Sequence, residues 1–205
     1  MDGNNRWSRK RSLSKYDSYK QGARKLITLS DNIFSNTKVD TISAFALSKN
    51  NMLRSSNIIK VIKKILFEAL IQLENKNKNY DLVFIGDFDF LEKKIKNLIL
   101  KINKNQLFKK KLVIYLNYGG REDIQQAAKF INFKHKFEKN LLTFGFSDPD
   151  ILIRTGGFKR ISNFLLYQLA FTELFFLNKL WPDISYADIL RIISQFNKIE
   201  RKFGK

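Results

Sequence analysis

Arg154 and Arg160 bracket the pair Gly156-Gly157, and this combination of residue types is suited to binding phosphate. A guanidinium group can donate two parallel hydrogen bonds to one phosphate group. Glycines leave backbone N–H groups free to approach an anion closely. Taken alone, these residues fit a structural turn with two solvated arginines equally well. The sequence has neither a Walker A motif nor a Gly-x-Gly-x-x-Gly motif, so the common modes of nucleotide binding are disfavoured.

Two further polar segments share a feature with this one, because each follows a short apolar run that we predict to be a strand. The three segments are Gly86-Asp87, Asn117–Arg121 and Arg154–Ser162, and the strands before them are Leu82–Ile85, Leu112–Leu116 and Ile151–Ile153. In open α/β sheets, ligands bind beyond the carboxyl ends of the strands. We therefore expect the functional site at this edge of the sheet.

The elements that position these segments alternate between strand and helix. Apolar residues recur at helical spacing in several stretches, and Ser185-x-x-Asp188 resembles a capping box that opens a last helix. The expected helices are Lys20–Asn32, Ile58–Leu73, Phe90–Ile102, Glu122–Ile131, Asn163–Ala170 and Ser185–Ile199; Val39–Leu47 and Leu174–Leu177 are further strands, and the first 20 residues form a loop. This alternation predicts a single α/β domain around a mostly parallel sheet.

Composition narrows the possible functions. The 205 residues include no cysteine and one histidine, His135, which rules out thiolate and multi-histidine metal sites. His135 lies among lysines and is expected to be solvated. The net charge of +19 favours polyanions, anionic membranes or phosphorylated substrates, or reflects drift in an AT-rich genome. Nucleic acid is a weak candidate, since no binding motif is present and the positive residues are dispersed.

The sequence also bears on the location of the protein. It has no run of about 18 apolar residues, the length that a membrane-spanning helix needs. Its first residues are polar and lack the apolar stretch of a signal peptide. We therefore expect a cytoplasmic protein.

Six segments, in this order along the chain, resemble the motifs of the cis-prenyltransferase family, which includes the undecaprenyl diphosphate synthases. They are Met1–Trp7, Asn117–Arg121, Asp148–Gly157, Arg160–Leu174, Leu180–Asp183 and Glu200–Gly204. The resemblance covers essentially the whole chain. It implies one domain over residues 1–205, with a central, mostly parallel sheet flanked by helices and a hydrophobic tunnel. The apolar face of Ile58–Leu73, which by itself is typical of a core helix, would then be a tunnel wall.

The resemblance implies an isoprenyl transferase that joins isopentenyl diphosphate to an allylic diphosphate such as farnesyl diphosphate. The product would be a long-chain cis-polyprenyl diphosphate, undecaprenyl diphosphate in particular, which serves as the lipid carrier for cell-wall sugars. Asp2 would be catalytic and would hold Mg²⁺ together with Glu173. The implied substrate-binding residues are Gly3, Asn4, Asn5, Arg6 and Trp7 for the allylic substrate, and Arg154, Arg160, Ile161 and Ser162 for isopentenyl diphosphate.

The chain departs from the family pattern at several positions. Asn5 replaces a glycine of the family motif, and Tyr19 replaces a histidine. Tyr19 can still donate one hydrogen bond to a phosphate but cannot carry a positive charge near neutral pH. Lys15 would compensate for the missing charge. The family's Phe-Ser-x-Glu-Asn-Trp segment corresponds to Phe45–Asn51, in which Ser, Glu and Trp do not line up. With a shifted alignment, Asn50 stands for the family's Asn, which implies a catalytic role, and Arg54 stands for the following Arg, which implies substrate binding. This divergence motivates an alternative function, that of a weakened or non-catalytic relative acting as an accessory subunit.

Two more expectations follow from the resemblance. The apolar strand that precedes Met1 in the family is missing from this sequence, so we expect the natural start to lie upstream, because the neighbouring strands would otherwise lose their pairing partner. We also expect a homodimer with contacts through Glu173–Leu177 and Arg201–Gly204. Contact with the inner face of the membrane would be peripheral and would occur through the product.

Overall fold

The computed structural model describes residues 1–53, 56–74, 79–131 and 136–201. Arg54, His135 and the segment 202–204 lie outside the described residues, so the predictions made for them stay predictions. Within the described residues, no helix is both long enough and apolar enough to cross a membrane.

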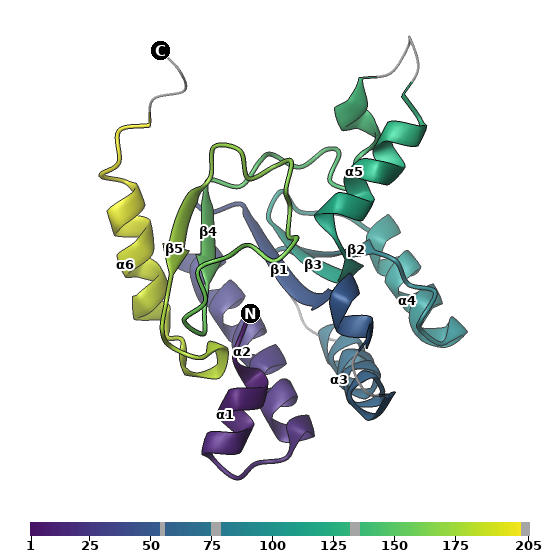
Figure 1. Cartoon of the computed structure of the whole chain (residues 1–205), viewed down its shortest axis with the longest axis vertical. Coiled ribbons are helices and arrows are strands. Elements are labelled where there is room, and N and C mark those ends of the chain that lie inside the picture. The colour runs from purple at the N-terminus through teal and green to yellow at the C-terminus, as the bar shows by residue number, and fades with distance from the viewer. Residues whose placement is uncertain (54–55, 75–78, 132–135, 202–205) are drawn as a thin grey trace.

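The strands form two parallel sheets (Figure 1). The larger sheet contains β1 (Thr41–Ser48), β2 (Asp81–Gly86) and β3 (Lys111–Tyr118) in the order β1-β3-β2. The smaller sheet pairs β4 (Ile151–Arg154) with β5 (Glu173–Phe176). All three strand pairings are parallel, which confirms the predicted α/β class. The predicted central sheet is thus divided into two parts among the described residues.

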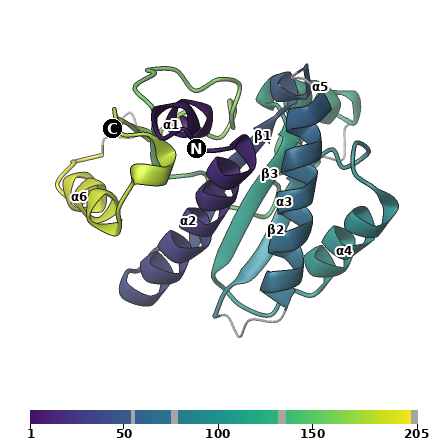
Figure 2. The same ribbon diagram turned by 90° about the horizontal axis from the view of Figure 1, so that it is seen from below.

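Helices surround both sheets (Figures 1 and 2). Their bounds are α1 Asn4–Lys10, α2 Lys15–Asn36, α3 Ser56–Glu74, α4 Lys93–Lys104, α5 Gly120–Lys129 and α6 Tyr186–Phe196, with short 3₁₀ turns η1 Lys49–Leu53, η2 Phe137–Asn140 and η3 Trp181–Asp183. Helix α2 packs against both α3 and α6, so it links the part of the molecule around the larger sheet to the part around the smaller one. The core includes Leu29 and Phe34 of α2, Leu112 of β3 and Ile184 beside α6.

Strand β2 is an outer strand whose free edge is covered by side chains of α4 and its C-terminal end. Asn103 accepts a hydrogen bond from the Phe84 N–H and donates one to the Phe84 carbonyl, both at 2.8 Å. Gln106 Nε2 donates to the Leu82 carbonyl at 2.9 Å. The two amide side chains therefore satisfy backbone groups that an uncovered sheet edge would leave unpaired.

The predicted helix at Asn163–Ala170 is wrong, since this stretch is a series of turns. Ser162, Asn163 and Leu165 have φ values of 52°, 63° and 47°, in the left-handed region that an α-helix cannot use. Asn163 also bonds to a distant part of the chain, because its Oδ1 accepts from the Arg121 N–H at 2.8 Å and its carbonyl from the Gly120 N–H at 2.8 Å. These contacts replace the local helical hydrogen bonds.

The N-terminal region also differs from the prediction, because the first 20 residues contain α1 and the first turns of α2 instead of a loop. Ser14 is the N-cap of α2, and its hydroxyl accepts a hydrogen bond from the Asp17 N–H at 3.0 Å. Gly3 precedes α1 with φ of 110°. The predicted helix Lys20–Asn32 lies within α2, whereas α1 has Trp7 as its one large apolar residue, so the apolar spacing that we used to predict helices does not detect α1.

The capping box of α6 is confirmed, although the helix ends at Phe196 and not at Ile199. Asp188 accepts hydrogen bonds from the Ser185 N–H and hydroxyl at 2.9 and 2.8 Å, and from Lys179 Nζ at 2.8 Å. Donation by Lys179, followed by donation from the Ser185 backbone, lowers the pKa of the Asp188 carboxyl from 3.8 to about 2.

Asp188→Ala is expected to lower stability at pH 7 by about 1 kcal/mol, or about 2 to 4 °C in Tm, because it removes the N3 carboxylate of the capping box, which accepts from Ser185 and Lys179. A carboxyl whose pKa is lowered in the folded state stabilises above pH 3.8, and this contribution disappears as the pH falls through about 2. The difference in Tm between wild type and variant should therefore shrink across this pH range. Thermal unfolding followed by circular dichroism measures it, and a constant difference would contradict the assigned role of Asp188.

Candidate active site

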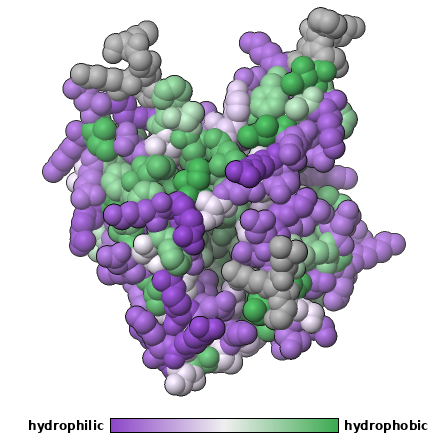
Figure 3. Space-filling model, viewed as in Figure 1, coloured by the Kyte–Doolittle hydropathy of each residue, from purple (hydrophilic) through white to green (hydrophobic). Residues whose placement is uncertain are grey.

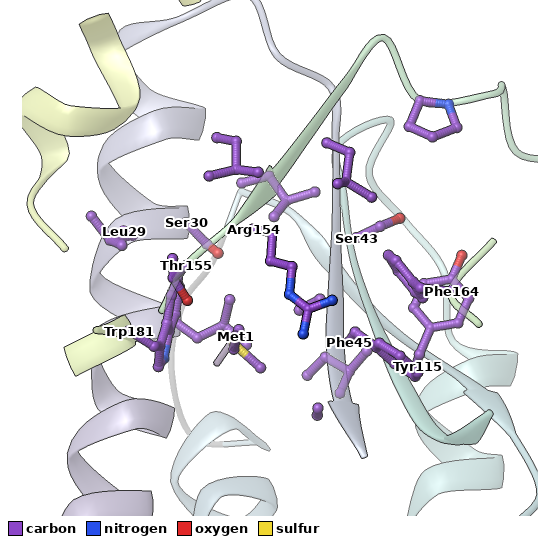
Figure 4. A pocket seen from close by; sticks show the side chains of 18 of the residues that line it. Met1, Leu29, Ser30, Ser43, Phe45, Tyr115, Arg154, Thr155, Phe164 and Trp181 are labelled. Carbon is purple, nitrogen blue, oxygen red and sulfur yellow. The ribbon is translucent and has the colours of Figure 1, made fainter. Parts of the chain in front are cut away.

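A cavity of about 1260 Å³ lies between β1 and β4, the strands that form the facing outer edges of the two sheets. Figure 4 shows the Arg154 side chain extending into this space, with Phe45, Tyr115 and Phe164 on one side and Trp181 on the other. Apolar side chains of α2 and α3 line its walls, namely Leu26, Leu29, Ile33, Ile62, Ile65, Leu66 and Ala69. The helix predicted to be a tunnel wall thus borders the cavity.

The polar lining of the cavity brings together residues from the two ends of the chain. Arg154 Nη2 donates to Asp2 Oδ2 at 3.0 Å, and Arg154 Nη1 donates to Ser162 Oγ at 2.7 Å and to the Arg160 carbonyl. Arg6 Nη2 lies 3.8 Å from Asp2 Oδ1. The first residues and the loop after β4, which the sequence predicted to carry the site, therefore meet around one carboxylate.

Thr155 holds the Asp2 backbone in place. Its hydroxyl accepts a hydrogen bond from the Asp2 N–H and donates one to the Asp2 carbonyl, both at 2.9 Å. The Asp2 carbonyl accepts a second hydrogen bond from the Trp181 N–H at 2.9 Å. Thr155 is only 2% exposed, so water cannot readily replace these bonds. The position of the Asp2 carboxylate therefore depends on a residue that the sequence did not single out.

Gly156 is the glycine on which this arrangement depends most. Its φ is 86°, and a Cβ atom would lie 2.4 Å from Arg6 Nη2 and 3.3 Å from the Asp2 carbonyl oxygen. A side chain at this position would force the Arg6 guanidinium to move, and the backbone conformation itself is strained for residues other than glycine. The N–H groups of Gly156 and Gly157 donate to the carbonyls of Lys179 and Leu177 at 2.8 and 2.9 Å, so the prediction that they are free to bind an anion is wrong. The glycine at 156 instead allows Arg6 to lie directly against the loop.

Several polar atoms at this end of the cavity are buried without a hydrogen-bond partner among the described residues. They are Asn4 Oδ1, Asn5 Oδ1 and Arg6 Nη2. Buried polar groups normally have partners, because leaving one unpaired costs about 1 to 3 kcal/mol. Arg6 Nη2 is a donor that can pair with a phosphate oxygen, whereas the two amide oxygens are acceptors and need a donor or a cation, so the start of α1 suits a binding site for a charged ligand.

Trp7 was predicted to pack beside the substrate, but it is not one of the described residues that line the cavity. Its Nε1 donates to Asp183 Oδ1 at 2.8 Å, and Arg11 donates to the same oxygen at 3.0 Å while stacking on the Trp7 ring at 4.5 Å. Ser18 Oγ donates to the Asn4 carbonyl at 2.6 Å. These contacts fix α1 to η3 and α2, so Trp7 positions the helix that carries Asn4, Asn5 and Arg6.

The remaining predicted residues divide into two groups. The predicted site residues that line the cavity are Asp2, Gly3, Asn4, Asn5, Arg6, Tyr19, Arg154, Arg160, Ile161 and Ser162. Lys15, Asn50 and Glu173 do not appear among the described lining residues, whereas Asn51 does. Glu173 begins β5 and pairs with Ile151, at the opposite end of this two-stranded sheet from Arg154. Within the described chain, the two carboxylates predicted to share a metal ion are therefore not brought together.

An aromatic cluster, which the sequence did not reveal, lines the cavity on the side of β1 and β3. The rings of Phe45 and Phe164 stack with centroids 4.5 Å apart, and Tyr115 meets Phe164 edge-on at 5.1 Å. Burial raises the pKa of Tyr115 to about 12, so its hydroxyl stays protonated. Phe45 and Tyr115 are opposite each other in the β1–β3 register, a pairing that no local pattern could indicate.

The cavity thus has a cationic end and an apolar interior. Guanidinium groups can hold an anionic headgroup, and the walls formed by α2 and α3 can hold a long apolar chain. This combination suits an enzyme that acts on amphiphilic diphosphates.

The comparisons with known proteins agree with this class. A family model described as "Putative undecaprenyl diphosphate synthase" matches residues 1–204. The chain therefore belongs to the undecaprenyl diphosphate synthase family of cis-prenyltransferases, and it is a prenyltransferase. The family assignment made from the sequence motifs is confirmed.

Relatives match the whole chain. An isoprenyl transferase of Prochlorococcus marinus is 36% identical over 100% of this chain and 81% of its own length. Cis-prenyltransferase 7 of Solanum lycopersicum is 34% identical over 100% of this chain and 78% of its own. Lavandulyl diphosphate synthase from Lavandula x intermedia, solved in complex with dimethylallyl diphosphate, has a TM-score of 0.86 and 26% identity, with 100% and 95% coverage. A probable undecaprenyl diphosphate synthase from Campylobacter jejuni has a TM-score of 0.78 and 30% identity, with 90% and 92% coverage.

Thr155→Val is expected to destabilise the protein by about 1 to 3 kcal/mol, because it leaves the buried Asp2 N–H without its partner while keeping the side-chain volume. Thr155→Ser is the matched control, since it keeps the hydroxyl and loses only a methyl group, worth about 1 kcal/mol. Urea denaturation of the two variants and the wild type measures the difference. A Val variant as stable as the wild type would show that the two hydrogen bonds to Asp2 contribute nothing.

Proposed function

We propose that this prenyltransferase condenses isopentenyl diphosphate with an allylic diphosphate, farnesyl diphosphate, to make a long-chain cis-polyprenyl diphosphate. The product we propose is undecaprenyl diphosphate, the lipid carrier for cell-wall sugars. The observation that carries this proposal is the convergence of Asp2, Arg6 and Arg154 at one end of an apolar cavity. A relative from Buchnera aphidicola, 36% identical, is named as a farnesyl-diphosphate-specific undecaprenyl diphosphate synthase, which supports this choice of substrate and product.

The two diphosphates would occupy neighbouring parts of the cationic end. We assign the allylic diphosphate to Gly3, Asn4, Asn5 and Arg6 at the start of α1, because Arg6 Nη2 is a buried donor without a hydrogen-bond partner among the described residues. We assign isopentenyl diphosphate to Arg154, Arg160, Ile161 and Ser162. The apolar tail of the allylic substrate would then extend between α2 and α3.

The chemistry follows from this placement. The bond between C1 and the diphosphate oxygen of the allylic substrate breaks as the double bond of isopentenyl diphosphate attacks C1, and a proton leaves the new chain. Negative charge grows on the departing diphosphate. Donors that already point at this position, such as the Arg6 guanidinium, stabilise that charge without reorganising, which lowers the barrier. The low-dielectric cavity strengthens this effect and keeps water from reacting with the allylic carbon.

Mg²⁺ is the proposed cofactor, and the residues present fit it. The described residues contain no group of three or more His, Asp or Glu side chains that could hold a metal by themselves. Mg²⁺ is commonly bound by one or two carboxylates together with phosphate and water oxygens, a set that Asp2 and a diphosphate can supply. When bound, the ion would neutralise charge on the leaving diphosphate. A contribution from Glu173 stays a prediction, since this residue is at the far end of β5.

An accessory, non-catalytic role is less favoured. The divergent segment Phe45–Asn51 motivated it, and Asn50, the residue aligned with the family's Asn, does not line the cavity. Asn51 does line it, however, and can offer the same amide chemistry. The intact contacts of Asp2 with Arg6 and Arg154 support an active enzyme.

We further propose that the enzyme is a homodimer that acts in the cytoplasm and touches the inner face of the membrane only peripherally, through its product. Figure 3 shows apolar surface over β5 and near the end of α5. Leu174 of β5 is exposed, as are Leu142 and Phe144 between η2 and β4, and a hydrogen bond between Gln168 and Thr143 connects that segment to the one before β5. A partner copy would cover these side chains.

The activity is tested with purified protein, farnesyl diphosphate, labelled isopentenyl diphosphate and Mg²⁺. Chain-lengthened lipid is expected from the wild type, and its length on chromatography identifies the product. Asp2→Ala should lose about 100-fold or more of the activity, since it removes the proposed metal ligand and the partner of two guanidinium groups. Folded wild-type protein that incorporates no label would refute the proposed reaction.

The dimer is tested by Phe144→Glu, which places a charge on the exposed apolar surface. We expect the mass in solution, measured by light scattering after size-exclusion chromatography, to change from that of two chains to that of one. Leu107→Glu is the matched control. Leu107 is also an exposed apolar residue, at 84% exposure, but it precedes β3 of the larger sheet and is not part of the proposed interface. A dimer that survives Phe144→Glu, or a wild-type monomer, would contradict the proposed interface.

A further inference from the structure

Three arginines of the cationic end converge on a single aromatic side chain, Phe158. The ring centroid lies 4.2 Å from Arg160 Cζ, 4.9 Å from Arg6 Cζ and 5.6 Å from Arg154 Cζ. All three distances are within the range of about 6 Å in which a cation is attracted to the face of an aromatic ring. Phe158 lines the cavity and is 39% exposed. It follows Gly157, whose φ of 81° directs the loop.

This convergence needs an electrostatic explanation, because like charges repel each other. Asp2 pairs with Arg154 at 3.0 Å and lies 3.8 Å from Arg6. Arg160 forms no recorded ion pair among the residues that the structure describes. One carboxylate therefore accompanies three guanidinium groups, and the negative face of the Phe158 ring supplies part of the missing compensation.

An aromatic ring differs from a second carboxylate in what it leaves free. A carboxylate would accept hydrogen bonds from the guanidinium N–H groups and would compete with an incoming phosphate for them. The ring attracts the positive charge without accepting strong hydrogen bonds. Consistent with this, Arg6 Nη2 is buried and has no hydrogen-bond partner among the described residues. The donors that a diphosphate needs are thus held nearby and remain available.

We propose that Phe158 is a positioning residue whose ring gathers the guanidinium groups of Arg6, Arg154 and Arg160 before the diphosphates arrive. This inference rests on the proposed function, since it takes the diphosphates of prenyl substrates as the anions. The ring touches Arg6, assigned to the allylic subsite, and Arg160, assigned to the isopentenyl subsite. It therefore preorganises the boundary between the two subsites, and binding requires less rearrangement of long side chains.

The first test compares Phe158→Leu, which keeps an apolar side chain without a ring, with Phe158→Tyr, which keeps the ring. We expect Leu to raise the KM for isopentenyl diphosphate about fivefold to tenfold, with kcat changed less than about twofold, and Tyr to restore most of the affinity. Arg160 is closest to the ring, so the KM for isopentenyl diphosphate should change more than that for farnesyl diphosphate. A Tyr variant as weak as the Leu variant, or a loss confined to kcat, would overturn the proposal.

The second test does not depend on turnover. Isothermal titration calorimetry measures the binding of inorganic pyrophosphate to the wild type and both variants, with Tm recorded for each. The proposal expects weaker binding for Leu, near wild-type binding for Tyr and the same Tm throughout. Equal or tighter binding by Leu, or no binding by the wild type, would refute it. If the wild type makes no prenyl product but the calorimetry follows this order, the proposed function fails while the role of Phe158 stands.

Discussion

The attachment of Asp2 to the end of β4 is the interaction on which the site depends. Thr155 bonds to both backbone groups of Asp2, and Arg154 bonds to its carboxylate. These contacts join residues more than 150 positions apart, so they form only when the whole fold is in place. They also fix the start of α1, and with it Asn4, Asn5 and Arg6. Glycine is favoured at 156 because its φ of 86° is strained for other residues and because a side chain would displace the Arg6 guanidinium.

Fixing these residues concentrates positive charge, and the molecule offsets this charge in two different ways. Asp2 accepts hydrogen bonds and directs Arg154, while the ring of Phe158 attracts three guanidinium groups without occupying their donors. Bringing cations together costs free energy in a partly desolvated site, and an anionic ligand recovers it. The free energy stored in this way contributes to diphosphate binding, and the same donors act on charge that develops during bond cleavage.

The sequence predicted the parts of this structure that depend on local pattern. Strands β2, β3 and β4 extend the predicted runs by at most two residues at either end. That Arg154 contacts both Asp2 and Ser162 agrees with the family resemblance, which placed these residues in one site, and not with any local pattern. The misses concern long-range contacts. Asn163 bonds to the Arg121 N–H instead of continuing a helix, and Trp7 turns toward Asp183 instead of the cavity. Neither partner lies within the spacing that a periodic pattern can detect.

A large cavity at the centre of a small domain has a cost, because protein interiors are normally close-packed and empty volume forgoes dispersion contacts. Leu26 and Leu29 of α2 and Ile65 and Leu66 of α3 face such a volume. Helices α2 and α3 also pack against each other, so the cavity lies beside their contact. The contact of Ser18 with Asn4 and that of Trp181 Nε1 with the Gly22 carbonyl tie α2 to the N-terminal segment and to η3. The hydrogen bonds around the cationic end therefore fix α2, one wall of the apolar cavity, to the N-terminal segment that carries the anion site.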